Sequence, residues 1–237
     1  MGGVGRWALI VLGVAALAAV AIPNILDPKV SWADTSSIAA LRNLASVQAD
    51  FRKRALVDGD GDGIGEFGTF GEMTKTCGLR KDSTGTARGA LLSVAVLSPV
   101  FTNVSADGIA TRSLYCFRIL LPAKGGGWSR EGPPGAPMSA PVDSDGAEAR
   151  WCAYAWPDRD YGELTGTGRN HIRTLFVDQS GDVWQTMNLD RRYKTPSGGP
   201  AWDAAMPAES KGAGWVSPSS SSAEFVGRDG NTWTRLP

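Results

Sequence analysis

An uncharged apolar segment near the N-terminus constrains this chain more than any other feature. Residues 7–26 read WALIVLGVAALAAVAIPNIL and contain no charged side chain. As an α-helix, a segment of this length spans about 30 Å, which is the thickness of the hydrocarbon core of a bilayer. The sequence therefore predicts a segment that crosses a membrane once.

The charges beside this segment predict its orientation. Arg6 precedes it, whereas Asp27 and Lys29 follow it and cancel, so the positive charge favours a cytoplasmic N-terminus and an exported remainder. A cleaved signal peptide is the alternative, because small residues suited to signal peptidase occur at 19–21 and 31–33. Both interpretations export the chain from residue 34 onward.

An amphipathic helix is predicted after the apolar segment. Leu41, Leu44 and Phe51 recur at intervals of three to four residues, with charged and polar residues between them, which is typical of a helix that buries one face. Residues 34–36 (Asp-Thr-Ser) are good N-cap types and predict its start. The Asp-Gly pair at 58–59 predicts its end, because helix propensity is low there.

The first 60 residues resemble the type IV pilins and type II secretion pseudopilins. The similarity is carried by the AIPNIL string, by SSIAALRNLASVQADF and by the glycine-rich DGDGDGIGEFG that follows. It implies a long helix, first transmembrane and then amphipathic, that packs on an antiparallel, meandering β-sheet head, which is an α+β fold. The family's Gly-Phe processing site is absent, and Arg6 occupies the register of its helix glutamate.

The resemblance also implies a domain layout, a location and partners. We expect a membrane-spanning N-terminal helix at 1–33, its amphipathic continuation at 34–57 and an exported globular head at 58–237. The location would be the bacterial inner membrane, with the head in the periplasm or outside the cell. The expected partners are the membrane and other pilin-like subunits or secretion machinery.

An acidic loop at 58–69 predicts a calcium site. Its alternating aspartates and Gly63 match the first six positions of a calcium loop, in which carboxylates converge on one cation. The predicted ligands are the side chains of Asp58, Asp60, Asp62 and Glu66 and the carbonyl of Ile64, with water or Glu72 completing the set. A solvated Asp-Gly turn without any ligand is the alternative. The second acidic stretch, DSDG at 143–146, is interpreted as a plain turn.

The C-terminal half is expected to bury an aromatic-rich core. Seven of the nine tryptophans lie between residues 128 and 233, and several short β-type runs bounded by Gly, Pro or Asp predict strands. Hairpins are expected at 174–187 and, through an Asp-Gly turn at 229–230, at 224–236. Short helices are expected at 69–77 and 87–97, and a long Gly/Pro/Ser loop at 195–222. Cys116 and Cys152 are the candidate disulfide pair, although any of the three pairings among Cys77, Cys116 and Cys152 is open.

Composition excludes several classes of function. Lys plus Arg equals Asp plus Glu at 24 each, so there is no positive excess for binding nucleic acid. The only histidine, His171, has no nucleophile marked beside it, and nothing places Asp143, Asp145 or Glu163 at a working separation. We expect no enzyme activity and no small-molecule substrate. The hypothesis is a structural pilin-like subunit, and the alternative is a calcium-stabilised binding module that does not polymerise.

Overall fold

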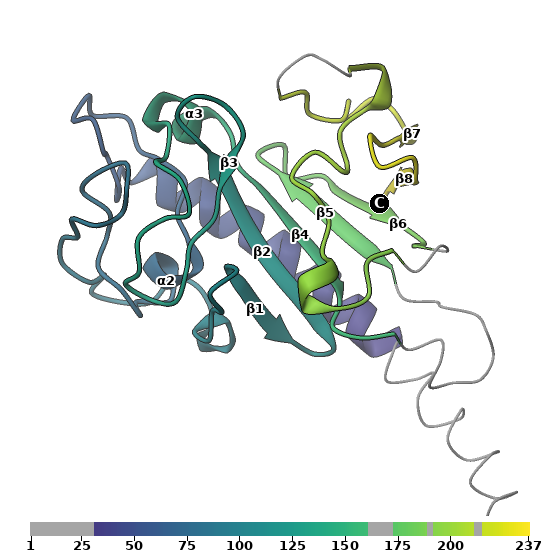
Figure 1. The fold of residues 1–237 in the computed structure, drawn as a ribbon, viewed down its shortest axis with the longest axis horizontal. Coiled ribbons are helices and arrows are strands. Elements are labelled where there is room, and N and C mark those ends of the chain that lie inside the picture. The colour runs from purple at the N-terminus through teal and green to yellow at the C-terminus, as the bar shows by residue number, and fades with distance from the viewer. Residues whose placement is uncertain (1–30, 161–172, 189–191, 211–214) are drawn as a thin grey trace, which may run out of the picture.

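An antiparallel sheet of eight strands lies at the centre of the computed structural model, which describes residues 31–160, 173–188, 192–210 and 215–237 (Figure 1). The strand order is β1-β2-β4-β5-β6-β8-β7, and β3 pairs with one end of β2. The strands are β1 (Ile109–Arg112), β2 (Tyr115–Pro122), β3 (Trp128–Ser129), β4 (Cys152–Pro157), β5 (Thr174–Asp178), β6 (Val183–Thr186), β7 (Glu224–Val226) and β8 (Thr232–Arg235). The predicted α+β class with an antiparallel sheet is thus confirmed.

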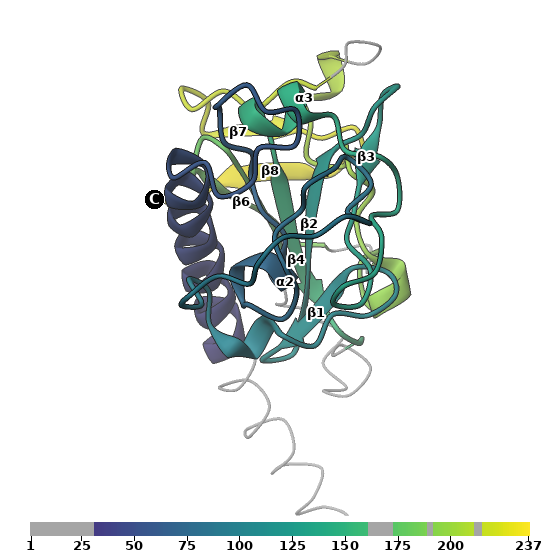
Figure 2. The ribbon, with the colours of Figure 1, turned by 90° about the vertical axis from the view of Figure 1, so that its left-hand side faces the viewer.

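Helical segments within the described residues are few and mostly short. The longest one is the N-terminal helix, which is helical from residue 31, the first described, to residue 53. The others are α2 (Phe70–Met73), α3 (Ser144–Ala149) and the single 3₁₀ turns η1 (Pro99–Phe101), η2 (Pro196–Gly198) and η3 (Ala208–Ser210). Figure 2 shows the N-terminal helix running alongside the sheet.

The N-terminal helix buries the face that its sequence predicts. Leu41, Leu44 and Phe51 are fully buried, whereas the positions between them are mostly exposed. The predicted start at 34–36 is wrong, because residue 31 is already helical and Asp34 lies inside the helix. The Asp34 carboxylate instead accepts a hydrogen bond from the Tyr115 hydroxyl and lies 3.6 Å from the Arg173 guanidinium. These contacts tie the helix to strand β2 and to the residue that precedes β5.

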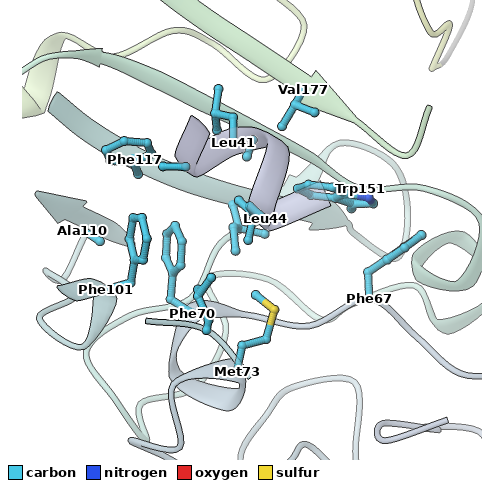
Figure 3. Packing of buried hydrophobic residues seen from close by; sticks show 14 of the residues in the cluster. Leu41, Leu44, Phe67, Phe70, Met73, Phe101, Ala110, Phe117, Trp151 and Val177 are labelled. Carbon is cyan, nitrogen blue, oxygen red and sulfur yellow. The ribbon is translucent and has the colours of Figure 1, made fainter. Parts of the chain in front are cut away.

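One face of the sheet packs against this helix. Figure 3 shows Leu41 and Leu44 of the helix beside Phe70, Phe117 and Trp151. Side chains alternate along a strand, so odd-numbered residues of β2 and β4 point to this side. The resulting core joins the N-terminal helix, α2, η1 and the central strands.

The opposite face carries the aromatic core expected in the C-terminal half. Even-numbered residues of β2 and β4 point there, and the core includes the fully buried rings of Tyr154, Trp156, Phe176, Trp184 and Trp233. The segment that contains η2 and residues 202–206 covers this face. The central strands are therefore buried on both sides, as the unbroken burial of β4 shows.

The two expected hairpins are present, but their context differs from a simple meander. β5 pairs with β6, and β7 pairs with β8, both antiparallel. However, β8 lies between β6 and β7. The last hairpin therefore pairs with the rest of the sheet through β8, its second strand, and β7 lies at the edge. The Asp229-Gly230 turn is not type I′, because only Gly230 has a positive φ. Residues 87–97 form no helix and 69–77 contain only the single turn of α2.

The helices of the structure contradict the expected location in the membrane. None of the helices within the described ranges is long and apolar enough to span a bilayer. The N-terminal helix fails because its exposed face carries charges such as Arg42, Asp50 and Arg52. The assignment as a single-pass inner-membrane protein with a periplasmic or extracellular head is therefore overturned. The apolar segment 7–26, on which it was based, lies outside the described residues.

The candidate disulfide between Cys116 and Cys152 is not formed. Both thiols are free and buried, as is that of Cys77. In the β2–β4 register, Cys116 is opposite Trp156 and Cys152 is opposite Leu120. The two cysteines are thus four residues apart along the strands, about 13 Å, whereas a disulfide requires Cα atoms within about 7 Å. Burial raises the pKa of Cys116 to about 12, so this thiol stays protonated.

Candidate functional site

The acidic loop folds back on itself through its own aspartates. Asp58 accepts hydrogen bonds from the backbone N–H groups of Gly61 at 2.7 Å and Gly63 at 3.1 Å. Asp62 accepts one from the N–H of Ile64 at 2.7 Å. Gly61 and Gly63 have φ values of 81° and 89°, a conformation that favours glycine. The turn is therefore specified locally by the alternation of aspartate and glycine.

Three of the predicted ligands are brought together by this turn. Carboxylate oxygens of Asp58, Asp60 and Asp62 all lie within 4.8 Å of one another. Two ligand atoms on one Ca²⁺ are at most about 4.6–5.2 Å apart, because each lies 2.3–2.6 Å from the ion. The spacing of this triad thus suits one hard cation with oxygen ligands. For Ile64, the structure gives only its N–H bond to Asp62 and a residue that is 48% exposed.

Glu66 is placed in a different environment. Its carboxylate is buried and accepts hydrogen bonds from the Gly59 N–H at 2.8 Å and the Ser144 hydroxyl at 2.9 Å. Its second oxygen lies 3.6 Å from the Arg80 guanidinium. Glu66 therefore fastens the base of the loop to α3, and the structure does not group it with the three aspartates.

Glu72, the other residue considered for the cage, also has internal partners. It accepts hydrogen bonds from the Thr69 N–H at 2.9 Å, where it completes a capping box on α2, and from the Arg80 N–H at 2.9 Å. The Arg80 side chain is 3.1 Å from it, which places Arg80 between Glu66 and Glu72. Such buried ion pairs require good geometry to offset the cost of desolvation. Here they fix the positions of Glu66 and Glu72 relative to Arg80.

A third buried glutamate caps the same short helix. Glu131 accepts hydrogen bonds from the N–H groups of Phe70 at 2.7 Å and Gly71 at 3.0 Å. Burial raises the pKa of Glu131 to about 7, and the negative charge of Glu72 adds to this, although the two N–H bonds oppose it. The position of Glu131 beside β3 thereby connects α2 to the sheet.

The 143–146 stretch was expected to be a plain turn, and this is wrong. Asp143 is the N-cap residue of α3, although its side chain makes no capping hydrogen bond, and Asp145 and Gly146 are helical. Oxygens of Asp145, Glu148 and Asp60 lie within 4.8 Å of one another. Figures 1 and 2 both show the loop and α3 side by side at one end of the sheet.

Glu148 is the site residue that sequence reasoning missed. Burial raises its pKa, and the nearby carboxylates of Asp62, Asp60, Asp145 and Glu66 raise it further. The signal available in the sequence was the spacing of three between Asp145 and Glu148, which puts both on one helix face. That signal required α3 to be recognised as a helix.

A polar cavity of about 350 Å³ opens beside this acidic group. Its walls include Asp60 from the loop, Asp145 from α3 and two groups from other segments, Asp82 and Lys124. Carboxylates thus outnumber cationic groups on its walls. The cavity gives water and small ions access to the carboxylates.

A second cavity, of about 260 Å³, lies beside three tryptophans at the surface. The ring of Trp128 is 5.9 Å from that of Trp202 and 4.5 Å from that of Trp215, and all three are half-buried. Arg150 and Asp143 also line this cavity. Aromatic rings with a few polar groups are typical of sites that bind a partner by contact area.

The remaining candidates for catalysis do not form a site in the described residues. Glu163 and His171 lie outside them, and Asp143 and Asp145 are both in the acidic region at α3. No family model, curated protein sequence or solved structure matches the chain. The function therefore has to be argued from the fold and from the two surface features above.

Proposed function

We propose that this chain is a non-enzymatic, pilin-like structural subunit, related in organisation to type IV pilins or type II secretion pseudopilins. One observation carries the proposal: a long amphipathic helix that precedes all the strands packs along one face of an antiparallel sheet. This is the organisation that the AIPNIL…SSIAALRNLASVQADF resemblance leads us to expect. In such an assembly, the N-terminal helix would contact other copies or related subunits.

The exposed ring at the start of the described helix supports this role. Trp32 is 63% exposed, and Arg42, Asp50 and Arg52 continue the exposed face of the helix. A large apolar side chain at the surface loses water contact when a neighbouring subunit covers it. The helix therefore offers an apolar contact near its start and a charged face further along.

Site-specific photo-crosslinking of the full-length chain in the cells that produce it tests this proposal. A photoreactive amino acid at position 32 is expected to give ladders of crosslinked copies or of related subunits. The matched control is position 94, because Val94 is also apolar and 71% exposed but lies far along the chain in the head. If position 32 gives no more product than position 94, the proposed assembly through the helix is refuted.

A second candidate, a calcium-stabilised binding module that does not polymerise, is favoured by two specific observations. The converging carboxylates of Asp58, Asp60 and Asp62 suit a cation, and the rings of Trp128 and Trp202 suit a binding surface. Calcium that binds only the folded protein must raise its melting temperature. An increase in melting temperature at millimolar calcium, for a protein that stays monomeric and gives no crosslinks, would favour this candidate over the first.

A further inference from the structure

An unpaired carboxylate oxygen is buried beside the acidic loop. The Glu148 residue is only 9% exposed, and its Oε1 atom is shielded from solvent without a hydrogen-bond partner. A buried carboxylate without a partner is costly, because it loses the hydration that it has in water. The surroundings of this oxygen therefore need a donor or a cation.

The Glu148 carboxylate lies beside two other carboxylates. Asp60 and Asp145 each place an oxygen within 4.8 Å of a Glu148 oxygen and of each other. Among the described residues, no ion pair joins these three to a lysine or arginine, although Lys124 lines the adjoining cavity. Like charges at this separation repel each other strongly in a partly buried site.

We propose that Asp60, Asp145 and Glu148 form a calcium site in which the ion joins the acidic loop to helix α3. Glu148 thus completes the ligand set, a role that the sequence analysis left to water or Glu72. The inference rests on the proposal that the acidic loop holds calcium, and it adds the ligands that come from outside the loop. Asp60 belongs to both carboxylate groups, so the loop triad and the α3 carboxylates are neighbours that share one residue.

The donor set selects the kind of ion. All the converging atoms are carboxylate oxygens, and hard cations prefer oxygen, whereas zinc and copper prefer histidine or cysteine. The distances among the three oxygens fit within the first coordination sphere of Ca²⁺. Asp60 and Asp145 are exposed, so water molecules can complete the six to eight ligands of calcium and the ion can enter from solvent.

Such an ion would connect two parts of the chain that are far apart in sequence. The loop continues directly from the N-terminal helix, and α3 leads directly into β4 at the centre of the sheet. Glu66 and Ser144 already join the same two segments by a hydrogen bond. Calcium would add a second link, which depends on the ion, beside the Ser144–Glu66 hydrogen bond. It would thereby fix the C-terminal end of the N-terminal helix relative to the sheet.

Calorimetric titration of the metal-free, full-length protein with calcium chloride tests this inference. Glu148→Gln and Asp145→Asn are expected to weaken calcium binding about tenfold or more, because each removes a charged ligand. Asp58→Asn tests the loop triad separately. Glu209→Gln is the matched control, since Glu209 is exposed in η3, and it should bind calcium like the wild type.

The outcomes separate the two levels of the proposal. If Asp58→Asn weakens binding while Glu148→Gln and Asp145→Asn do not, the loop holds calcium and the role of α3 is refuted. If the wild type takes up no calcium at millimolar concentrations, the loop site and its extension both fail. Neither result bears on the assembly tested by crosslinking.

Melting temperatures in EDTA and in calcium distinguish ligation from a merely structural role. In EDTA, Glu148→Gln should melt at or above the wild-type temperature, because it removes an unpaired buried charge. In calcium, its melting temperature should rise less than that of the wild type. A Glu148→Gln protein that is destabilised in EDTA but keeps the full calcium response would overturn the proposal.

Discussion

The buried Glu131 carboxyl predicts a specific pH dependence of stability. Its pKa in the folded protein is about 7, against an ordinary value of 4.5, and burial is the main cause. Since the folded state holds this proton more tightly than the unfolded state, protonation stabilises the fold. The contribution is fully present below pH 4.5, falls as the pH rises, and is lost above about pH 7.

The size of this effect follows from the gap between the two pKa values. A gap of about 2.5 pH units at 1.36 kcal/mol each corresponds to about 3 kcal/mol, most of it lost between pH 5 and pH 8. Glu131→Gln removes the titration and keeps the size of the side chain. It also places an amide NH₂ against one of the two N–H groups that Glu131 now binds, a pH-independent cost of about 1–3 kcal/mol.

Urea unfolding at pH 5 and pH 8 measures this contribution directly. We expect the wild type to lose about 2–3 kcal/mol more between these pH values than Glu131→Gln does. Glu209→Gln serves as the control, because Glu209 is exposed, and it should keep the wild-type slope. The reasoning is refuted if Glu131→Gln shows the same dependence on pH as the wild type, since another group would then be responsible.

Three further predictions concern the fold. Leu44→Ala removes a fully buried side chain from the helix–sheet core and should cost about 2–5 kcal/mol in urea unfolding, whereas Leu91→Ala, at an exposed position, should change stability by less than about 0.5 kcal/mol. Gly65→Ala would place its Cβ 2.0 Å from the Arg52 carbonyl oxygen, so we expect a lower melting temperature, and an unchanged one would contradict the close approach. Ser113→Asn should stabilise the two-residue β1–β2 turn by about 0.5–1 kcal/mol, because Ser113 has a φ of 49° and Asn tolerates this conformation better, and a decrease in the urea midpoint would argue against this.

Local patterns in the sequence predicted the elements whose structure is set by neighbouring residues. The spacing of Leu41, Leu44 and Phe51 predicted the buried helix face, and the β-type pattern at 174–187 predicted the β5–β6 hairpin. The curl of the acidic loop was also predictable, because Asp58 and Asp62 bind N–H groups only two to five residues away.

Features that depend on distant partners were not predictable in this way. Glu66 has the right spacing for a loop ligand, but its carboxylate instead accepts a hydrogen bond from Ser144 and pairs with Arg80. The helix of α3 was missed because a six-residue helix has too little periodicity to distinguish it from a turn. The role suggested for Glu148 depends on that helix, so it could be inferred only from the three-dimensional arrangement.

The two-sided burial of the sheet has a consequence for the order in which the chain acquires its structure. The apolar stripe of the N-terminal helix is synthesised first, but its partners extend to Val177 and Val183 on β5 and β6. β8, which is synthesised last, lies between β6 and β7 and contributes the buried ring of Trp233. Contacts so distant in sequence form slowly, since long loops have to close first. The helix stripe therefore stays partly uncovered until the last strands are made, which leaves it open to a chaperone that binds apolar helices.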